Sequence, residues 1–122
     1  METGNNTTTG VAKAIVLAFL KAMNEEDFKT AKQYVNDDLK FIGVMGTRDG
    51  GGVYIADMEK MKFKYDIKKI FEDVNDVSVF YDINMGGATI FSSGWYQLSG
   101  GKISSIKVIF DPRPLLEKSD KK

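Results

Sequence analysis

The chain has 122 residues, and its 17 basic and 17 acidic side chains cancel to a formal net charge of zero. A chain of this length is expected to form one domain, and without a basic excess it carries no electrostatic signature for nucleic acid or for an anionic membrane. It contains neither cysteine nor histidine, which excludes disulfides, thiol nucleophiles, the usual zinc sites and a Ser-His-Asp triad, so we expect no metal and no cofactor.

Residues 1–8 are polar and rich in Thr and Asn, and they are predicted to form a disordered leader. They lack the charged start and apolar centre of a signal peptide, and no apolar run is long enough to cross a bilayer. We therefore expect no membrane association and a cytoplasmic location. The rest is predicted to be a single domain, residues 9–116, with a charged tail at residues 117–122.

Three helices are predicted in the first half of the chain. The first begins near Thr9, and its apolar residues follow the i, i+3, i+4, i+7 spacing of a buried helix. These residues are Val11, Ala14, Ile15, Ala18, Phe19, Ala22 and Met23, with Val16, Leu17 and Leu20 widening the stripe. Asn24 ends this helix and is predicted to cap a second one, about Glu25 to Val35, with Asp27 as the acid of a capping box. A third helix is predicted from Val53 to about Phe63.

Strands are predicted between and after these helices. A turn at Asn36–Asp38 leads to a short strand, Leu39–Met45, and then to a glycine-rich loop, Gly46–Gly52. The later strands are predicted at about Ile67–Asp73, Val77–Asn84, Ala88–Leu98 and Ile103–Asp111, with turns at Met85–Gly87 and Ser99–Gly101. This order indicates an α+β domain, with three N-terminal helices packed on a curved, mainly antiparallel sheet.

The predicted hairpin at residues 77–98 assigns its side chains to two faces. The loop at Met85–Gly87 can shift the pairing only by two residues, so the faces do not depend on its exact position. The inner face carries Val77, Val79, Tyr81, Ile83, Ile90, Ser92, Gly94, Tyr96 and Leu98. The opposite face exposes Phe80, Phe91 and Trp95, and an exposed apolar patch of this kind usually marks a contact with another protein chain. A homodimer through this outer face is therefore predicted.

The order of elements resembles the SnoaL-like branch of the nuclear transport factor two-like superfamily. The resemblance includes Gly101-Lys102-Ile103 and the final Phe110-Asp111-Pro112-Arg113-Pro114, and it spans roughly residues 9 to 116. It implies a cystatin-like cone, in which a bent sheet wraps around the long first helix, with an apolar cavity at one end. It also implies frequent dimerisation through the outer sheet face. Activities in the superfamily include steroid isomerisation, polyketide cyclisation, epoxide hydrolysis and dehydration, and other members only bind ligands or mediate assembly.

Two specific enzyme patterns of the superfamily are missing from this chain. Aligned with the ketosteroid isomerases, the helix tyrosine falls on Phe19, the base on Gly43 and the second acid at about Gly94. The limonene epoxide hydrolase pattern needs an Arg and an Asp two residues apart on one strand. Neither long hairpin strand contains an Arg, so both specific activities are unsupported.

Several residues are candidates for a ligand site. Tyr81, Ser92 and Tyr96 lie on the inner face, and methionines with aromatic residues suit an adaptable apolar cavity, although plain core packing would use the same residues. The predicted ligand contacts are Phe19, Phe41, Met45, Tyr54, Met58, Tyr81, Ser92, Tyr96 and Phe110. Asp111 is the candidate acid or base and Arg113 a candidate anion clamp; alternatively, these two residues pair with each other or hold the C-terminal tail.

We therefore expect a protein that binds a small hydrophobic molecule, apolar or polyketide- or steroid-like, with no assigned activity. One alternative is a cofactor-independent acid–base isomerase, cyclase or dehydratase acting on an apolar substrate. Another is a non-catalytic dimeric interaction module. A cavity into which no polar group points would argue against the enzyme, and a buried carboxylate in the cavity would argue for it.

Overall fold

The computed structural model describes residues 10–116. Its helices are α2 (Val11–Asn24), α3 (Phe28–Gln33) and α4 (Gly51–Met61). Its strands are β1 (Val35–Gly43), β2 (Gly46–Asp49), β3 (Lys64–Asp73), β4 (Asp76–Met85), β5 (Ala88–Ser99) and β6 (Lys102–Phe110). The predicted leader at residues 1–8 and the predicted tail at residues 117–122 lie outside the described residues.

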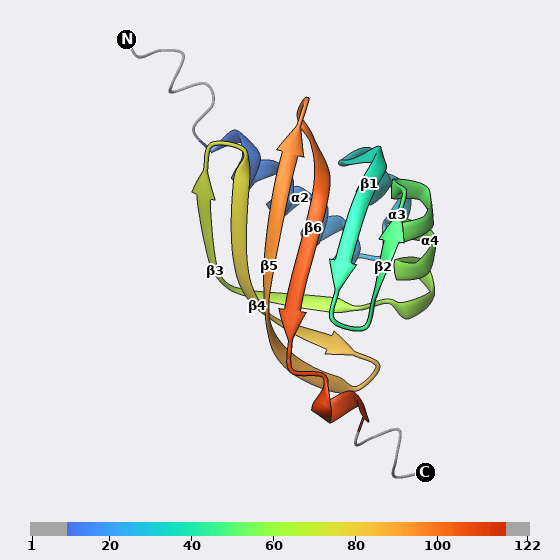
Figure 1. Ribbon diagram of the computed structural model, residues 1–122. Coiled ribbons are helices and arrows are strands. Elements are labelled where there is room, and N and C mark those ends of the chain that lie inside the picture. Colours follow the sequence, from blue (N-terminus) through green and yellow to red (C-terminus); the bar gives the residue numbers. More distant parts are fainter. Residues whose placement is uncertain (1–9, 117–122) are drawn as a thin grey trace.

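The strands form one curved sheet in the order β2-β1-β6-β5-β4-β3. Neighbouring strands are antiparallel except for β1 and β6, which run parallel. In Figure 1 the sheet faces the viewer and α2 crosses behind it. Helix α2 packs on β3 and β4, and α4 packs on β1 and β2. The predicted α+β architecture, with helices on a curved and mainly antiparallel sheet, is confirmed.

None of the helices within residues 10–116 is long and apolar enough to span a membrane.

A β-bulge contributes to the curvature of the sheet. Ile67 pairs with Tyr81 and Lys69 with Phe80, so Lys68 is an extra residue on β3. A bulge of this kind bends its strand and increases the local twist. Figure 1 shows β3 running across the lower part of the sheet and then turning upward.

The buried face of α2 differs from the predicted stripe. The side chains that it buries are Ala12, Val16, Phe19, Leu20, Ala22 and Met23. Val11 and Ala14, both predicted to be buried, are exposed. Because α2 is apolar over more than one stripe, its periodicity is compatible with two orientations. Packing against β3 and β4 selects the orientation that buries Val16 and Leu20.

The second helix is shorter than predicted, and its cap is different. Helix α3 begins after Asp27, whose carboxylate accepts a hydrogen bond from the backbone N–H of Thr30 at 3.2 Å. Asp27 is therefore the N-cap residue and not the acid of a capping box. The Asn24 side chain instead binds the backbone of Tyr65, accepting from its N–H at 2.7 Å and donating to its carbonyl at 2.8 Å. It ties the end of α2 to β3.

The predicted turn at Asn36–Asp38 is wrong, because β1 already begins at Val35. Val35 pairs with Ile103 of β6, and the N–H of Ile103 donates to the carbonyl of Tyr34 at 2.8 Å. Three turn-forming side chains in a row are a local signal. Pairing with a strand almost 70 residues away along the chain overrides that signal.

The glycine-rich segment at residues 46–52 is only partly a loop. Gly46–Asp49 forms β2, which pairs with β1 in a hairpin closed by Gly43 and Gly46. Helix α4 begins at Gly51, two residues before its predicted start. Strand β3 begins at Lys64, three residues before its predicted start. The hairpin brings Arg48 into the sheet, where it lies next to α4.

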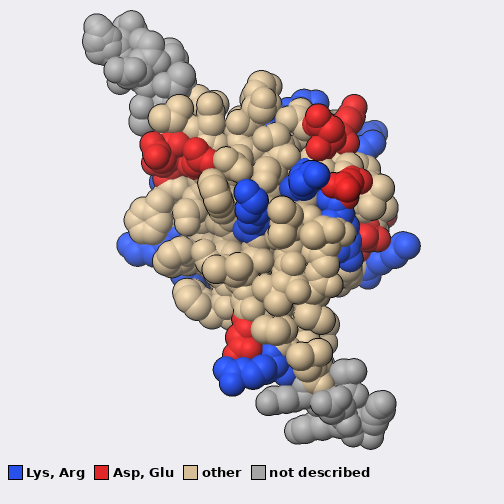
Figure 2. Space-filling view, in the orientation of Figure 1, with Lys and Arg blue, Asp and Glu red and all other residues tan. Residues whose placement is uncertain are grey.

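The two faces of the hairpin formed by β4 and β5 are as predicted. Met85 pairs with Ala88 across Gly86 and Gly87, which both have positive φ, as a two-residue hairpin loop requires. Every residue that was predicted for the inner face of the pair is buried. The outer face exposes large apolar side chains, which we call the outer patch: Phe71, Phe80, Phe91, Trp95 and Ile109. Figure 2 shows this side of the molecule, with acidic side chains near its margins.

The N-terminus of α2 is held by a carboxylate from the sheet. Glu72 accepts hydrogen bonds from the backbone N–H groups of Lys13, at 2.9 Å, and Gly10, at 2.6 Å. These hydrogen bonds lower the pKa of Glu72. A negative charge at this position also interacts favourably with the helix dipole.

Replacing Glu72 with Gln is expected to destabilise the protein at neutral pH. Because the folded-state pKa of Glu72 is lowered, its stabilising effect is present above the unfolded-state value of about 4.3 and is lost as the pH falls through the folded-state value. The difference between wild type and E72Q in urea unfolding should therefore be present at about pH 7 and shrink towards about pH 3. Glu59→Gln, on the exposed surface of α4, is the control and should show no such trend. A pH-independent difference would contradict the capping role.

Candidate functional site

A cavity of about 110 Å³ opens at the end of the molecule where the strands bend. It lies between the β1–β2 hairpin, α4, the start of β3 and the inner face of β4, β5 and β6. Apart from Arg48, the described residues that line it are uncharged: Phe41, Gly43, Val44, Met45, Gly46, Tyr54, Met58, Met61, Phe63, Tyr65, Tyr81, Ile83, Met85, Tyr96, Val108, Phe110 and Leu115. Val44, Met45 and Met61 are exposed and form its mouth.

Most of the predicted ligand contacts lie in this cavity. Its walls include Phe41, Met45, Tyr54, Met58, Tyr81, Tyr96 and Phe110. The other two predicted contacts do not line it. Phe19 is fully buried behind Tyr54 and Tyr96, with ring centroids 6.5 and 6.4 Å away. The Ser92 hydroxyl donates to the carbonyl of Ile90 at 3.0 Å.

Several wall residues were not predicted. Tyr65 and Phe63 were assigned to the end of the third helix or to the segment after it, and Arg48 to a loop. The alternation of Tyr65 and Ile67 with charged residues in β3 was a signal for a strand that includes Tyr65. No comparable signal in the sequence places Arg48 next to the cavity, because its position depends on how the β1–β2 hairpin packs.

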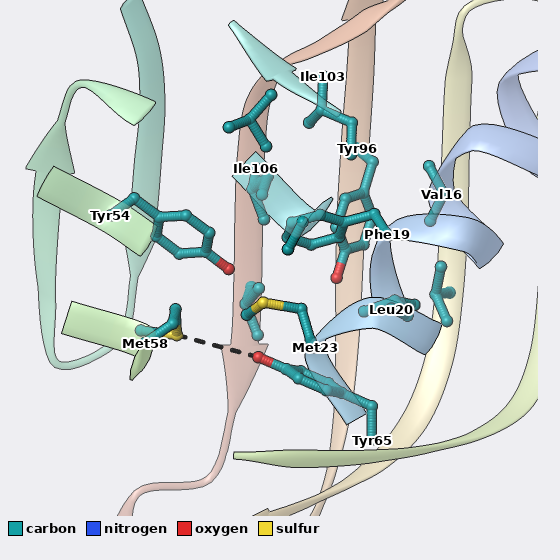
Figure 3. Close-up of a cluster of buried hydrophobic side chains, with 14 of the residues drawn as sticks. Val16, Phe19, Leu20, Met23, Tyr54, Met58, Tyr65, Tyr96, Ile103 and Ile106 are labelled. Carbon is teal, nitrogen blue, oxygen red and sulfur yellow. Dashed lines mark hydrogen bonds between the residues drawn. The ribbon is translucent and has the colours of Figure 1, made fainter. Parts of the chain in front are cut away.

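Four tyrosine hydroxyls lie in or beside the cavity wall. The hydroxyls of Tyr81 and Tyr96 are hydrogen-bonded to each other at 2.6 Å, and that of Tyr65 donates to the sulfur of Met58 at 3.9 Å. Figure 3 shows the hydroxyls of Tyr54, Tyr65 and Tyr96 directed towards the same region, next to Met23. The Tyr54 ring stacks on Phe41 with centroids 4.9 Å apart.

The four hydroxyls form a concentration of hydrogen-bond donors in an otherwise apolar wall. Burial is the main cause that raises the pKa of Tyr54, Tyr65, Tyr81 and Tyr96 above the ordinary value. All four are therefore neutral at physiological pH and keep their protons. Tyr81 and Tyr96 can use only one of their two hydroxyl protons in the bond between them. The other proton needs a different acceptor.

Gly94 makes room for the hydroxyl pair. It lies on β5 opposite Val79, on the same inner face as Tyr81 and Tyr96. A Cβ at this position would lie 2.2 Å from the Tyr81 oxygen and 2.9 Å from the Cε1 of Tyr96. No side chain can replace the glycine without moving at least one of these tyrosines. Gly94 is therefore a positioning residue for the cavity wall.

One ion pair lies at the cavity. The Nε of Arg48, on β2, donates to the carboxylate of Asp57, on α4. The side chains are 24% and 30% exposed, so the pair is partly shielded from water. Arg48 lines the cavity, and Asp57 does not. Among residues 10–116, no group of three or more acidic side chains is arranged to hold a metal ion.

Asp111 lies outside the cavity wall. Its carboxylate accepts hydrogen bonds from the Nε and Nη2 of Arg113, at 2.9 and 2.6 Å, and from the Arg113 backbone N–H at 3.0 Å. These bonds hold its pKa at about 2. The turn that they stabilise precedes Leu115, which contacts the cavity. The pairing that the sequence offered as the alternative to catalysis is present, and an acid–base role for Asp111 stays a prediction.

Comparisons with known proteins give no match to a protein-family model and no match to a curated protein. Solved structures do match. An NTF2-like protein of unknown function from Cytophaga hutchinsonii is 51% identical with a TM-score of 0.85, and the match covers 86% of this chain and 94% of that chain. An LEH-like epoxide hydrolase from M. tuberculosis is 24% identical over 89% of each chain, with a TM-score of 0.78.

A third similar structure is a Shewanella putrefaciens protein named as a SnoaL-like polyketide cyclase. It is 14% identical over 91% of this chain and 86% of that chain, with a TM-score of 0.75. At less than 25% identity, the hydrolase and the cyclase-like protein show a shared fold only. The Cytophaga hutchinsonii protein is similar in sequence over nearly all of its length.

Replacing Gly94 with Ala is expected to destabilise the protein by about 1–3 kcal/mol, because the added methyl group overpacks a buried contact. Removing the Tyr81 oxygen relieves the closest overlap, so G94A/Y81F should be more stable than the sum of the two single changes predicts. Urea unfolding of the four proteins in this double-mutant cycle measures the coupling. Strictly additive effects would show that Gly94 does not position Tyr81.

Proposed function

The chain belongs to the NTF2-like family, and on this basis we propose that it binds a small, mainly apolar molecule in the cavity between α4 and the inner face of the sheet. The observation that carries the proposal is the cavity itself. Its wall combines aromatic and methionine side chains with a few polar groups, which is the composition of small-molecule sites. Flexible methionines at its mouth suit a ligand of irregular shape.

The size of the cavity limits what it can hold. An apolar cavity of about 150 Å³ in another protein binds benzene. A space of about 110 Å³ is smaller than that, so at most a single ring fits, with part of it at the mouth. A larger polyketide- or steroid-like molecule would have to extend through the mouth, past Met45 and Met61. The exposure of both methionines leaves that route open.

The lining supports binding more than acid–base catalysis. An acid–base enzyme needs a group that exchanges a proton near neutral pH. Among the described residues that line the cavity there is no carboxylate, and the tyrosines have raised pKa values. The isomerase, cyclase or dehydratase alternative therefore lacks a proton-transfer group at this site. The similarity to an epoxide hydrolase and to a cyclase-like protein extends to the fold and not to such a group.

We also propose that the protein forms a homodimer through the outer patch. Phe80 makes edge-to-face contacts with Phe71 and Phe91, at centroid distances of 6.2 and 6.3 Å. Trp95 is held from two sides: its indole N–H donates to Asp76 at 2.9 Å, and the Lys107 ammonium lies 4.5 Å from the ring centroid. Exposed aromatic side chains that are already ordered lose little entropy on association. This supports a protein interface.

Ligand binding can be tested with toluene as the probe, by NMR titration of the full chain. Shifts should be confined to residues around the cavity. Val108→Phe, which places a ring in the cavity, should weaken binding about tenfold or more, which corresponds to a loss of about 1.4 kcal/mol or more. Val53→Phe makes the same change at an exposed position on α4 and should leave the affinity unchanged. Equal affinity of V108F and wild type would contradict binding in this cavity.

Dimerisation can be tested by sedimentation equilibrium. Wild type should sediment at twice the chain mass of 13.6 kDa. Phe91→Glu puts a charge in the outer patch and should give a monomer, because a buried unpaired charge is costly. Val53→Glu, at an exposed apolar position away from the sheet, should remain a dimer. A monomeric wild type at concentrations of about 100 μM would refute the proposal, because an interface of the usual size should hold at that concentration.

A further inference from the structure

Among the described residues, the polar side chains of the cavity are a guanidinium, which only donates, and tyrosine hydroxyls, which both donate and accept. Its side chains supply hydroxyls from Tyr54, Tyr65, Tyr81 and Tyr96 and the guanidinium of Arg48. A guanidinium has only N–H donors, and a carboxylate has only acceptors. Among the described lining residues no carboxylate or side-chain amide supplies an acceptor. A ligand that complements Arg48 therefore brings acceptors of its own.

Arg48 is placed to use its donors on a ligand. Its Nε is occupied by Asp57, which leaves the two terminal nitrogens of the guanidinium. One of them, Nη1, would lie 3.6 Å from a Cβ built on Gly46, so it borders a residue that lines the cavity. The pair with Asp57 holds the planar group in place. Such a group can bind a carboxylate through two parallel hydrogen bonds.

The charge of Arg48 reaches the hydroxyl of Tyr54. The positive charge acts on the Tyr54 hydroxyl and partly offsets the effect of burial on its pKa. Arg48 and Tyr54 therefore act on a shared region of the cavity. Anionic oxygen placed there would be stabilised by both groups in surroundings partly shielded from water.

Building on the proposed function, we propose that the cavity selects a small ring compound bearing one carboxylate, with the ring against Phe41 and Tyr54 and the carboxylate on Arg48. The two terminal nitrogens of Arg48 supply the two donors that one carboxylate accepts. Asp57 already neutralises part of the Arg48 charge, so a phosphate dianion would lack counter-charge. The apolar wall formed by Met58 and Val108 favours a ring over a polar chain.

Benzoate and benzamide test the charge requirement, because they have the same ring and differ in the carboxylate. Titration of the full chain should show benzoate binding about tenfold or more tightly than benzamide, since a charge-assisted hydrogen bond contributes more than a neutral one. Arg48→Met should weaken benzoate binding about tenfold or more and leave benzamide within about twofold. Benzoate, but not benzamide, should shift the Arg48 Nε–H resonance of wild type.

Two further variants control for an unpaired Asp57 carboxylate and for a change in net charge. R48M/D57N removes both charges, so no carboxylate is left without a partner, and it should lose benzoate binding as R48M does. Lys21→Met removes a positive charge from the exposed surface of α2 and should leave benzoate affinity unchanged. This control separates a local contact with Arg48 from an effect of net charge.

The outcomes separate this inference from the proposed function. If toluene binds in the cavity but benzoate binds no better than benzamide, or if R48M and R48M/D57N keep benzoate affinity, the carboxylate inference is wrong and cavity binding stands. If none of the three ring compounds binds, both fail. Loss of benzoate binding in K21M to the same extent as in R48M would also overturn the role of Arg48.

Discussion

The cavity depends on the contact between the Tyr81 hydroxyl and the backbone of Gly94. The oxygen of Tyr81 occupies the space that a Cβ of residue 94 would need, and there it meets the hydroxyl of Tyr96. This contact places two hydroxyls from neighbouring strands side by side in the buried wall of the cavity. With any other residue at position 94 the rings would have to move, and the shape of the wall would change with them.

The same hairpin carries both proposed surfaces. Successive residues of a strand point to opposite faces, so Trp95 belongs to the outer patch while its neighbours Gly94 and Tyr96 face the core. The inner face depends on close packing and paired hydroxyls. The outer face depends on aromatic side chains held by one another and by Asp76 and Lys107. A substitution in the outer patch can therefore be made without altering the cavity wall, and a substitution in the cavity wall without altering the outer patch.

Much of the fold was predictable because strand periodicity and hairpin turns are local signals. The inner and outer residues of β4 and β5 follow from alternation and from the loop at Gly86–Gly87. These signals correctly placed Tyr81 and Tyr96 inside and Phe80, Phe91 and Trp95 outside. The start of β1 was predicted incorrectly, and so was the burial of Val11 and Ala14 on α2, whereas Phe19, Ala22 and Met23 are buried as predicted. Both depend on partners distant in sequence: β6 for the strand, and β3 with β4 for the helix.

The residues of the candidate site also fall into two groups: those that local sequence patterns predicted and those that only packing brought together. The sequence by itself determined that one face of the meander would be apolar with tyrosines among its residues, because side-chain period and residue type are properties of the strand alone. Only the tertiary structure decided that Tyr65 and Arg48 join them, since β3 and β2 must first pack at the open end of the sheet. It also decided that Asp111 pairs with Arg113 instead of facing the cavity. Distances between residues far apart in the chain are set by packing, which no local pattern encodes.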